Sequence, residues 1–237
     1  MDTIEAIKKD LHSHIDPEKA AHLPKFFQAH PGGYGEGDLF LGVTVPNQRK
    51  VSRKYFKTIT MDELEELLNS KYHEHRLTAI FMLVLKYERA KTGHEQKQLV
   101  DFYLSNLSAV NNWDLVDSSA YKILGPYLYD KDKSLLYELA VSNNLWEQRI
   151  AIIATYHFIK KDDYTHTFEL AGLLIAHEHD LIHKAVGWML REVGKRNFEA
   201  EFNFLISRYK QMPRTMLRYA IEKFEPELRK KFLAGTI

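Results

Sequence analysis

The chain has 237 residues, enough for one large domain or two small ones, and 45% of them are apolar and 27% charged. It has no cysteine, which excludes disulfides, cysteine-ligated zinc and a cysteine nucleophile, and fits a reducing cytoplasm. The formal net charge is only +1, so a nucleic-acid surface would have to come from the arrangement of the basic residues, and no apolar run is long enough to span a membrane.

Near the N-terminus, a helix is expected in PEKAAHLPKFF, and Pro24 should break or shorten it. A glycine-rich loop is predicted at residues 31–38. Its Gly33, Gly35 and Gly37 form a G-x-G-x-G string, but no strand precedes it, so a dinucleotide site is not predicted.

Beyond this loop the chain is poor in glycine and proline, and its apolar residues recur at spacings of three and four. Leu64, Leu67 and Leu68 are an example. No stretch alternates long enough to predict a sheet. We therefore predict an all-α protein, helical almost throughout.

Five segments look like copies of one unit, in which a polar residue and a charge open a helix with an apolar inner face. Their charged positions are separated by 41, 32, 35 and 30 residues, a spacing typical of HEAT or armadillo repeats. The sequence thus predicts an α-α superhelix of paired antiparallel helices, forming a single domain over residues 1–237. The five charged residues are Arg76, Asp117, Arg149, Lys184 and Arg214.

Equivalent positions of stacked repeats lie on one side, so these residues should form a row along a concave face. Four of the five are cations, although the helix macrodipole disfavours a cation near a helix N-terminus. One interpretation is the solvated edge that any such array must have. The other is an anionic polymer lying along the row, because phosphate contacts position a protein on a duplex.

Asp117 is the one carboxylate of the row, and Trp113 shares its helix face four residues earlier. Asp114 is interpreted as a first-turn or capping carboxylate. Nearby cations should keep Asp117 ionised. An ion pair bridging two repeats is the structural alternative for Asp117.

Of the two remaining tryptophans, Trp146 is assigned to the core. Trp188 follows Gly187, whose missing side chain is expected to leave a hollow beside the ring. A cleft with a carboxylate and indoles would attract a cation and stabilise positive charge developing on a sugar. His179 and His183 are four residues apart but lack an HExxH pattern, so no metal or cofactor is expected.

At these residues the sequence resembles the AlkD family of bacterial DNA glycosylases, which are built from HEAT-like repeats. The likeness runs over most of the chain and is most specific in WDLVDSS, NNLWEQRIAI and IHKAVGWMLRE. It implies hydrolysis of the N-glycosidic bond of cationic N3- and N7-alkylpurines in double-stranded DNA. It also implies a monomer working in the cytoplasm near the nucleoid, without a cofactor.

The resemblance further implies roles for individual residues. Asp117 would be the catalytic carboxylate, and Trp113 and Trp188 would flank the lesion nucleotide. Arg149 would contact the DNA backbone beside it, and Arg49 and Arg191 match positions that the family uses to hold DNA. An alkylated purine is already a good leaving group, so a single carboxylate that stabilises the sugar cation and positions water suffices.

One departure from the family concerns the N-terminal segment that approaches the minor groove. HPGGYGEGD is inserted after the second helix, and Pro24 lies within that helix. The first alternative is therefore a paralogue that binds DNA weakly without excision. A protein–protein scaffold of HEAT repeats is the second alternative.

Overall fold

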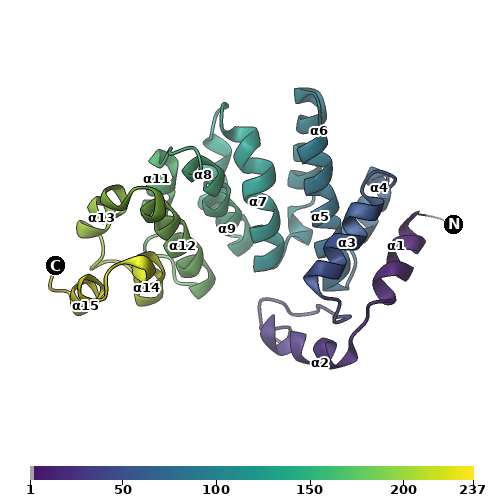
Figure 1. Ribbon diagram of the computed structural model, residues 1–237, viewed down its shortest axis with the longest axis horizontal. Coiled ribbons are helices and arrows are strands. Elements are labelled where there is room, and N and C mark those ends of the chain that lie inside the picture. Colours follow the sequence, from purple (N-terminus) through teal and green to yellow (C-terminus); the bar gives the residue numbers. More distant parts are fainter. Residues whose placement is uncertain (1–2) are drawn as a thin grey trace. The chain divides into compact units, whose positions relative to one another are not determined.

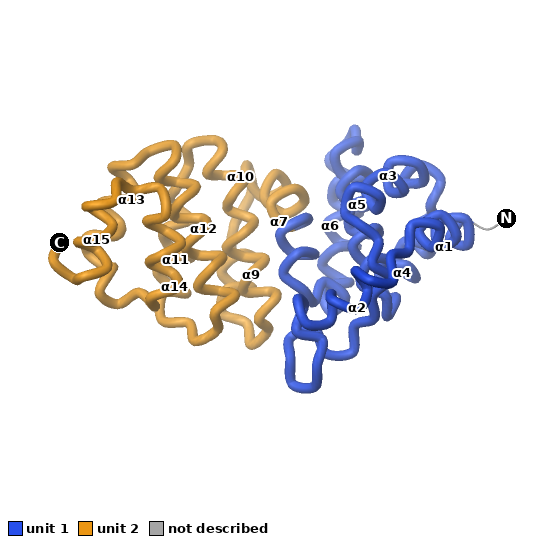
Figure 2. Tube along the Cα trace, turned by 60° about the horizontal axis from the view of Figure 1, so that its bottom comes forward, with its two compact units in different colours: residues 1–119 blue, residues 120–237 orange. Residues whose placement is uncertain are grey.

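The computed structural model describes residues 3–237, which form helices and loops with one isolated parallel bridge between Leu39 and Tyr72 (Figure 1). The all-α prediction is thus confirmed. Among these residues, no helix is both long and apolar enough to cross a membrane. The chain divides into two compact units, residues 1–119 and 120–237, and the division falls within α7 (Figure 2).

Unit 1 is built around α5, which packs against α3, α4 and α6. Side chains such as Ile80, Met82 and Leu83 are buried on it. Capping boxes at Thr60 and Thr92 fix the starts of α4 and α6. The helices are α1 (Thr3–His12), α2 (Pro17–Phe26), α3 (Val45–Tyr55), α4 (Met61–Leu68), α5 (His73–Arg89), α6 (Gly93–Ser105), the 3₁₀ turn η1 (Leu107–Ala109) and the start of α7 (Trp113–Leu128).

Unit 2 is built around α12, which packs against α9, α13 and α14. Trp146 is buried in this unit, which confirms its assignment to the core. The Asn144 and Asn197 side chains cap α9 and α13. The helices are α8 (Ser134–Ala140), α9 (Leu145–Ala154), α10 (Tyr156–Ile159), α11 (Thr165–Leu173), α12 (Asp180–Arg196), α13 (Phe198–Ile206), α14 (Arg214–Ala220), the 3₁₀ turn η2 (Ile221–Lys223) and α15 (Pro226–Ala234).

The N-terminal segment differs from the expectation in one respect. α2 is not broken at Pro24, because the helix includes this residue and ends at Phe26. The glycine-rich loop at 31–38 is a series of turns, as predicted. Gly42 has φ +78°, and a Cβ there would lie 2.1 Å from the Asp16 carbonyl oxygen, so only glycine lets this loop pass so close to the start of α2.

Candidate functional site

α7 begins where the predicted site begins. The Asn112 side chain accepts a hydrogen bond from the Trp113 backbone N–H at 2.9 Å, and the Val116 N–H bonds to the Asn112 carbonyl. Trp113 and Asp117 lie one turn apart on this helix, and both side chains are partly exposed. The structure therefore places the two residues on one face of α7, as the spacing predicts.

The Trp113 ring lies against two aromatic side chains from the end of α2. Phe27 stacks on it with ring centroids 5.4 Å apart, and Phe26 meets it edge-on at 5.8 Å. Phe27 is buried, whereas Phe26 remains 61% exposed. The end of α2 thus covers part of the indole that was predicted to contact a lesion nucleotide.

Asp114 lies in the first turn of α7, as predicted, and also takes part in a chain of charged side chains that begins at His73. His73 donates from Nε2 to Asp114 Oδ2 at 2.8 Å and from Nδ1 to Asp38 Oδ2 at 3.2 Å. Burial disfavours the charged imidazole, but the hydrogen bonds to Asp114 and Asp38 outweigh it and raise the pKa of His73 to about 9. With both nitrogens donating, His73 is an imidazolium at neutral pH.

Arg76 is the last member of this series of paired side chains, and its position differs from the prediction. The row of helix-start charges predicted an exposed cation for DNA, but Arg76 is only 5% exposed. Its Nη2 donates to Asp38 Oδ2 at 2.7 Å and its Nη1 to the Ser70 carbonyl at 3.1 Å. The loop after α2 brings Asp38 over the start of α5, so this guanidinium neutralises an internal carboxylate.

Arg49 is the other predicted cation of unit 1, and it is partly exposed on α3. Its guanidinium lies 3.9 Å from the centroid of the Phe81 ring on α5, close enough for a cation–π contact. Phe81 also lines a cavity together with residues of α2.

In unit 2, Trp188 is partly exposed on α12. Its Nε1 donates to Glu192 Oε1 at 3.0 Å, and its ring lies 5.9 Å from that of Tyr156. The hollow expected from Gly187 is not there. A Cβ on Gly187 would lie 2.5 Å from both the Met216 carbonyl oxygen and the Tyr219 Cβ, so this glycine lets α14 pack closely on α12.

The predicted cations of unit 2 differ in exposure. Arg149 is 4% exposed, and its Nη1 donates to the carbonyl of Leu181 in the first turn of α12. The other three lie nearer the surface. Lys184 pairs with Asp180 at 2.6 Å, Arg191 pairs with Glu222, and Arg214 donates to the Leu233 carbonyl at 2.5 Å.

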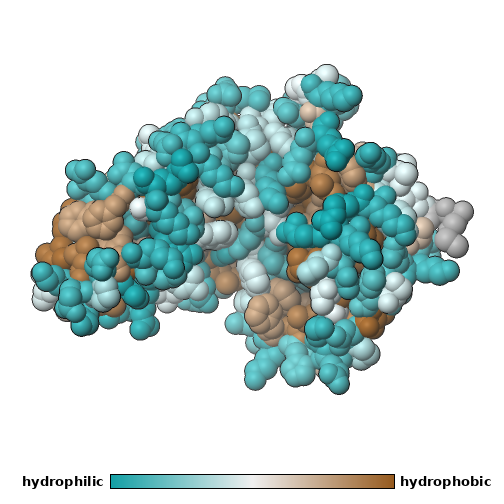
Figure 3. Space-filling view, viewed as in Figure 1, coloured by the Kyte–Doolittle hydropathy of each residue, from teal (hydrophilic) through white to brown (hydrophobic). Residues whose placement is uncertain are grey.

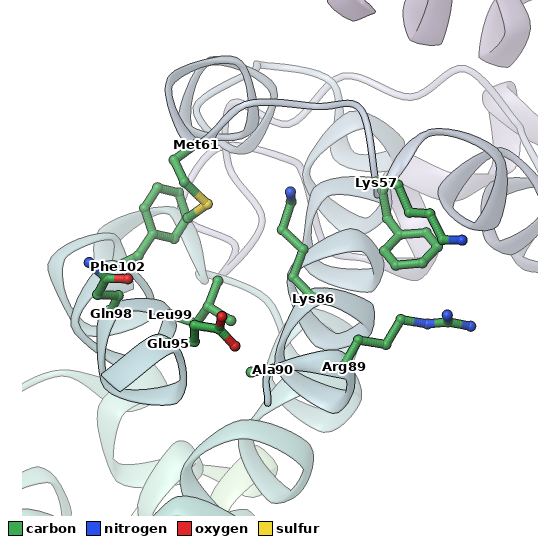
Figure 4. Close-up of a pocket in the computed structure, with 10 residues that line it drawn as sticks. Lys57, Met61, Lys86, Arg89, Ala90, Glu95, Gln98, Leu99 and Phe102 are labelled. Carbon is green, nitrogen blue, oxygen red and sulfur yellow. The ribbon is translucent and has the colours of Figure 1, made fainter. Parts of the chain in front are cut away.

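Unit 1 holds two sizeable cavities. The larger cavity, about 650 Å³, lies between α6 on one side and the C-terminal ends of α3 and α5 on the other. The charged groups that line it do not point toward one another (Figure 4). Lys57 and Arg89 extend to the side of α5 opposite Gln98 and Phe102, and Lys86 Nζ donates to the Ile59 carbonyl at 2.9 Å. This arrangement offers no shared binding point.

The second cavity, about 550 Å³, lies beneath α2 and is lined by residues that include Trp113 and Asp114. No group of three or more His, Cys, Asp or Glu side chains within residues 3–237 is placed to hold a metal ion. Sequence reasoning did not find the His73 chain or the Phe27 contact. Nothing in the local spacing of the HEH string at residues 73–75 connects it with Asp38 or Asp114.

The chain is similar in sequence to one protein family and in fold to solved structures. The family model described as "DNA alkylation repair enzyme" matches residues 7–224. A structure described as a predicted DNA alkylation repair enzyme from Enterococcus faecalis is similar with a TM-score of 0.68 and 18% identity, covering 90% of this chain and 98% of that one. AlkD2 from Streptococcus mutans is similar with a TM-score of 0.55 and 17% identity, covering 89% and 99%. No curated protein sequence matches.

Proposed function

Because the chain belongs to the DNA alkylation repair enzyme family, we propose that it is a DNA glycosylase that hydrolyses the N-glycosidic bond of cationic N3- and N7-alkylpurines in double-stranded DNA. It acts as a monomer in the cytoplasm. The observation that carries the proposal is the partly exposed Asp117 carboxylate, one helical turn after the Trp113 indole on α7.

The chemistry needs little beyond this pair. The alkylated base already carries positive charge and leaves without a general acid, so the barrier lies in the positive charge that develops on the sugar. The Asp117 carboxylate opposes that charge and accepts a hydrogen bond from the attacking water. The Trp113 indole contacts the lesion nucleotide, and the family resemblance alone assigns the same role to Trp188.

DNA binding is assigned to the accessible cations Arg49, Lys184, Arg191 and Arg214, which meet phosphates without reading sequence. The resemblance assigns a backbone contact to Arg149 as well. Its burial and its bond to the Leu181 carbonyl favour a positioning role, in which Arg149 holds the first turn of α12, the helix that carries Lys184. Arg76 is left out, because Asp38 uses its charge.

The test is release of 7-methylguanine from methylated duplex DNA by the purified protein. Asp117→Asn keeps the size of the side chain and removes its charge, and we expect the rate to fall by about 10²–10³. DNA binding should stay unchanged or tighten slightly, since the variant repels phosphates less. Asp101→Asn, an exposed carboxylate on α6, is the matched control. An unchanged rate in Asp117→Asn would make this carboxylate structural.

A DNA-binding protein without excision activity is the second candidate. The observation that favours it is the contact of Phe26 and Phe27 with the Trp113 ring, which withdraws part of a proposed lesion contact. This candidate predicts duplex binding that weakens steeply with salt, together with no release of 7-methylguanine by the wild-type protein.

A further inference from the structure

A lysine that the proposed function does not use lies over two tyrosine rings. The Lys160 ammonium is 4.7 Å from the centroid of the Tyr121 ring on α7 and 4.4 Å from that of the Tyr156 ring on α10. The two rings also contact each other, with their centroids 5.2 Å apart. All three residues belong to unit 2. Because the face of an aromatic ring attracts positive charge, both tyrosines hold the same ammonium group.

The backbone explains how one lysine reaches both rings. α9 ends at Ala154 and the short helix α10 begins at Tyr156, so Lys160 follows the last residue of α10. The Lys160 backbone N–H bonds to the Tyr156 carbonyl at 3.2 Å, which places the two side chains one helical turn apart on the same face. A side chain in this position leans toward the N-terminus of its helix, and thus over the Tyr156 ring. Tyr121 reaches the same ammonium from α7.

The charge of Lys160 is not cancelled within the protein. Among residues 3–237 its ammonium forms no salt bridge, whereas Lys184 pairs with Asp180 and Arg191 with Glu222. An aromatic ring orients a cation without neutralising it, since the ring carries no net charge. Lys160 is also exposed, so its full charge is available to an anion outside the protein.

The rings continue to the indole that the family resemblance assigns to the lesion nucleotide. The Trp188 ring centroid lies 5.9 Å from that of Tyr156. The Trp188 Nε1 donates to Glu192 Oε1 at 3.0 Å, and Lys195 Nζ donates to the same oxygen at 2.6 Å. Lys160 is thus separated from Trp188 by a single ring, and a DNA strand that reached Trp188 would lie close to this lysine.

Two carboxylates near the rings are already paired with other cations. They form the ion pairs Glu192–Lys195 at 2.6 Å and Asp162–Arg196 at 2.7 Å. Neither therefore competes for Lys160. A second cation, Lys122, lies 5.6 Å from the centroid of the Tyr121 ring. The charges at this place thus favour an anionic ligand.

Well-exposed apolar side chains of unit 2 lie elsewhere. Phe198 and Ile206 on α13 are 50% and 40% exposed, and Figure 3 shows apolar surface around this helix near the C-terminal end. Tyr121 and Tyr156 are only partly exposed, and the exposed group that lies over them is an ammonium. The surface at Lys160 therefore offers a polar contact and not an apolar docking site.

We propose that Lys160 binds a backbone phosphate of double-stranded DNA, and that Tyr121 and Tyr156 are positioning residues that hold its ammonium for this contact. A lysine side chain loses rotamer freedom when it is fixed, and rings that already restrict it in the free protein reduce this loss on binding. In unit 1 the Arg49 guanidinium lies over the Phe81 ring in the same way. The inference rests on the proposed function only in taking duplex DNA as the anion, and it needs no bond cleavage.

The experiment is fluorescence anisotropy of the full-length protein with unmodified duplex DNA over a salt series. Lys160→Ala should weaken binding roughly fivefold and reduce the salt slope by about one unit, because one phosphate contact is lost. Lys160→Arg keeps the charge and the ring contacts and should retain most of the affinity. Lys161→Ala is the matched control, because Lys161 is exposed and lies over neither ring. Wild-type affinity and slope in Lys160→Ala, or an equal loss in Lys161→Ala, would overturn the proposal.

The rings are tested through the lysine that they hold. Tyr121→Leu removes one ring face and should weaken duplex binding about twofold, whereas Tyr121→Phe keeps the ring and should bind like the wild type. In the Lys160→Ala background, Tyr121→Leu should have no further effect. A tyrosine with a purely structural role would weaken binding by the same factor in both backgrounds, and that result would refute the positioning role.

The result is separable from that of the proposed function. Weaker duplex binding by Lys160→Ala, together with no release of 7-methylguanine by the wild type, refutes the glycosylase and supports the Lys160 contact. Release of 7-methylguanine by a wild type whose duplex binding Lys160→Ala leaves unchanged overturns the contact alone. Absence of duplex binding by the wild type also overturns the contact.

Discussion

The central helices of the two units begin in opposite ways. α5 and α12 are both 17 residues long and both carry the core of their unit. The first residues of α5, His73 to Arg76, are all buried although every one is titratable. The corresponding part of α12 leaves Asp180, His183 and Lys184 at least partly exposed.

The cause of the difference is the segment after α2. It brings the Asp38 carboxylate to His73 and Arg76, and the backbone N–H groups of Leu41 and Gly42 to Glu74. α12 has no such cover, and Lys184 pairs with Asp180 of its own first turn. A charged helix start therefore forms buried ion pairs and hydrogen bonds in unit 1, whereas it remains on the surface in unit 2.

The largest effect is expected from the two arginines at equivalent repeat positions. Arg76→Met removes one partner of a buried ion pair and should lower the free energy of unfolding by about 3–5 kcal/mol. Arg214→Met, at the exposed position, should cost less than about 1 kcal/mol. Urea denaturation followed by circular dichroism measures both. Similar losses in the two variants would show that burial does not separate these positions.

The second prediction concerns pH. The folded-state pKa of His73, about 9, lies above its unfolded value of 6.5, so its contribution is complete below pH 6.5 and is lost as the pH rises through 9. Burial lowers the pKa of His75 to about 4, so its contribution is present above pH 6.5 and is lost as the pH falls towards 4. Each of these two pKa shifts corresponds to about 3 kcal/mol of folding stability.

His73→Gln should therefore flatten the alkaline side of the stability profile of unit 1. Unit 2 also loses stability as the pH rises, because burial raises the pKa of the Glu201 carboxyl from 4.5 to about 9, so that its contribution is complete below pH 4.5 and is lost as the pH rises through 9. Glu201→Gln should remove that part. If His73→Gln left the alkaline side of the profile unchanged in a Glu201→Gln background, the imidazolium assignment would be wrong.

The third prediction tests helix packing. Gly187→Ala would push a methyl group against the Met216 carbonyl and Tyr219, so we expect a loss of about 1–3 kcal/mol in stability. At Gly93, in the first turn of α6, a Cβ meets open space. Gly93→Ala should therefore stabilise by about 0.4–1 kcal/mol. The melting temperatures of the Gly187→Ala and Gly93→Ala variants measure the two effects, and a lower value is expected only for Gly187→Ala.

The smallest effect concerns the surface charges of α12. Lys184→Ala should weaken damaged and undamaged duplexes alike and reduce the salt slope of binding by about one unit. Asp180→Asn releases the same lysine from its partner and should strengthen binding. Fluorescence anisotropy over a salt series measures both. Equal slopes for Lys184→Ala and the wild type would remove this lysine from the DNA surface.

Local pattern alone determined much of this protein. Apolar spacings of three and four predicted the helices, and the scarcity of breakers predicted the all-α class. The five repeated charges each lie within the first five residues of a helix, namely α5, α7, α9, α12 and α14. The spacing of Trp113 and Asp117 placed them on one helix face. These inferences held because the α-helix repeats every few residues, so a short stretch of sequence contains the information.

Only the tertiary structure decided where the charges go. Arg76 and Lys184 occupy similar positions in sequence. Arg76 is buried because a loop some forty residues earlier in the chain brings Asp38 to it, whereas Lys184 has no such cover. In the same way, the structure turned Asp114 to His73, set Phe27 on Trp113 and used Gly187 for packing. A side chain takes its charge partner from whatever segment lies against it, and no periodicity within a single helix specifies that segment.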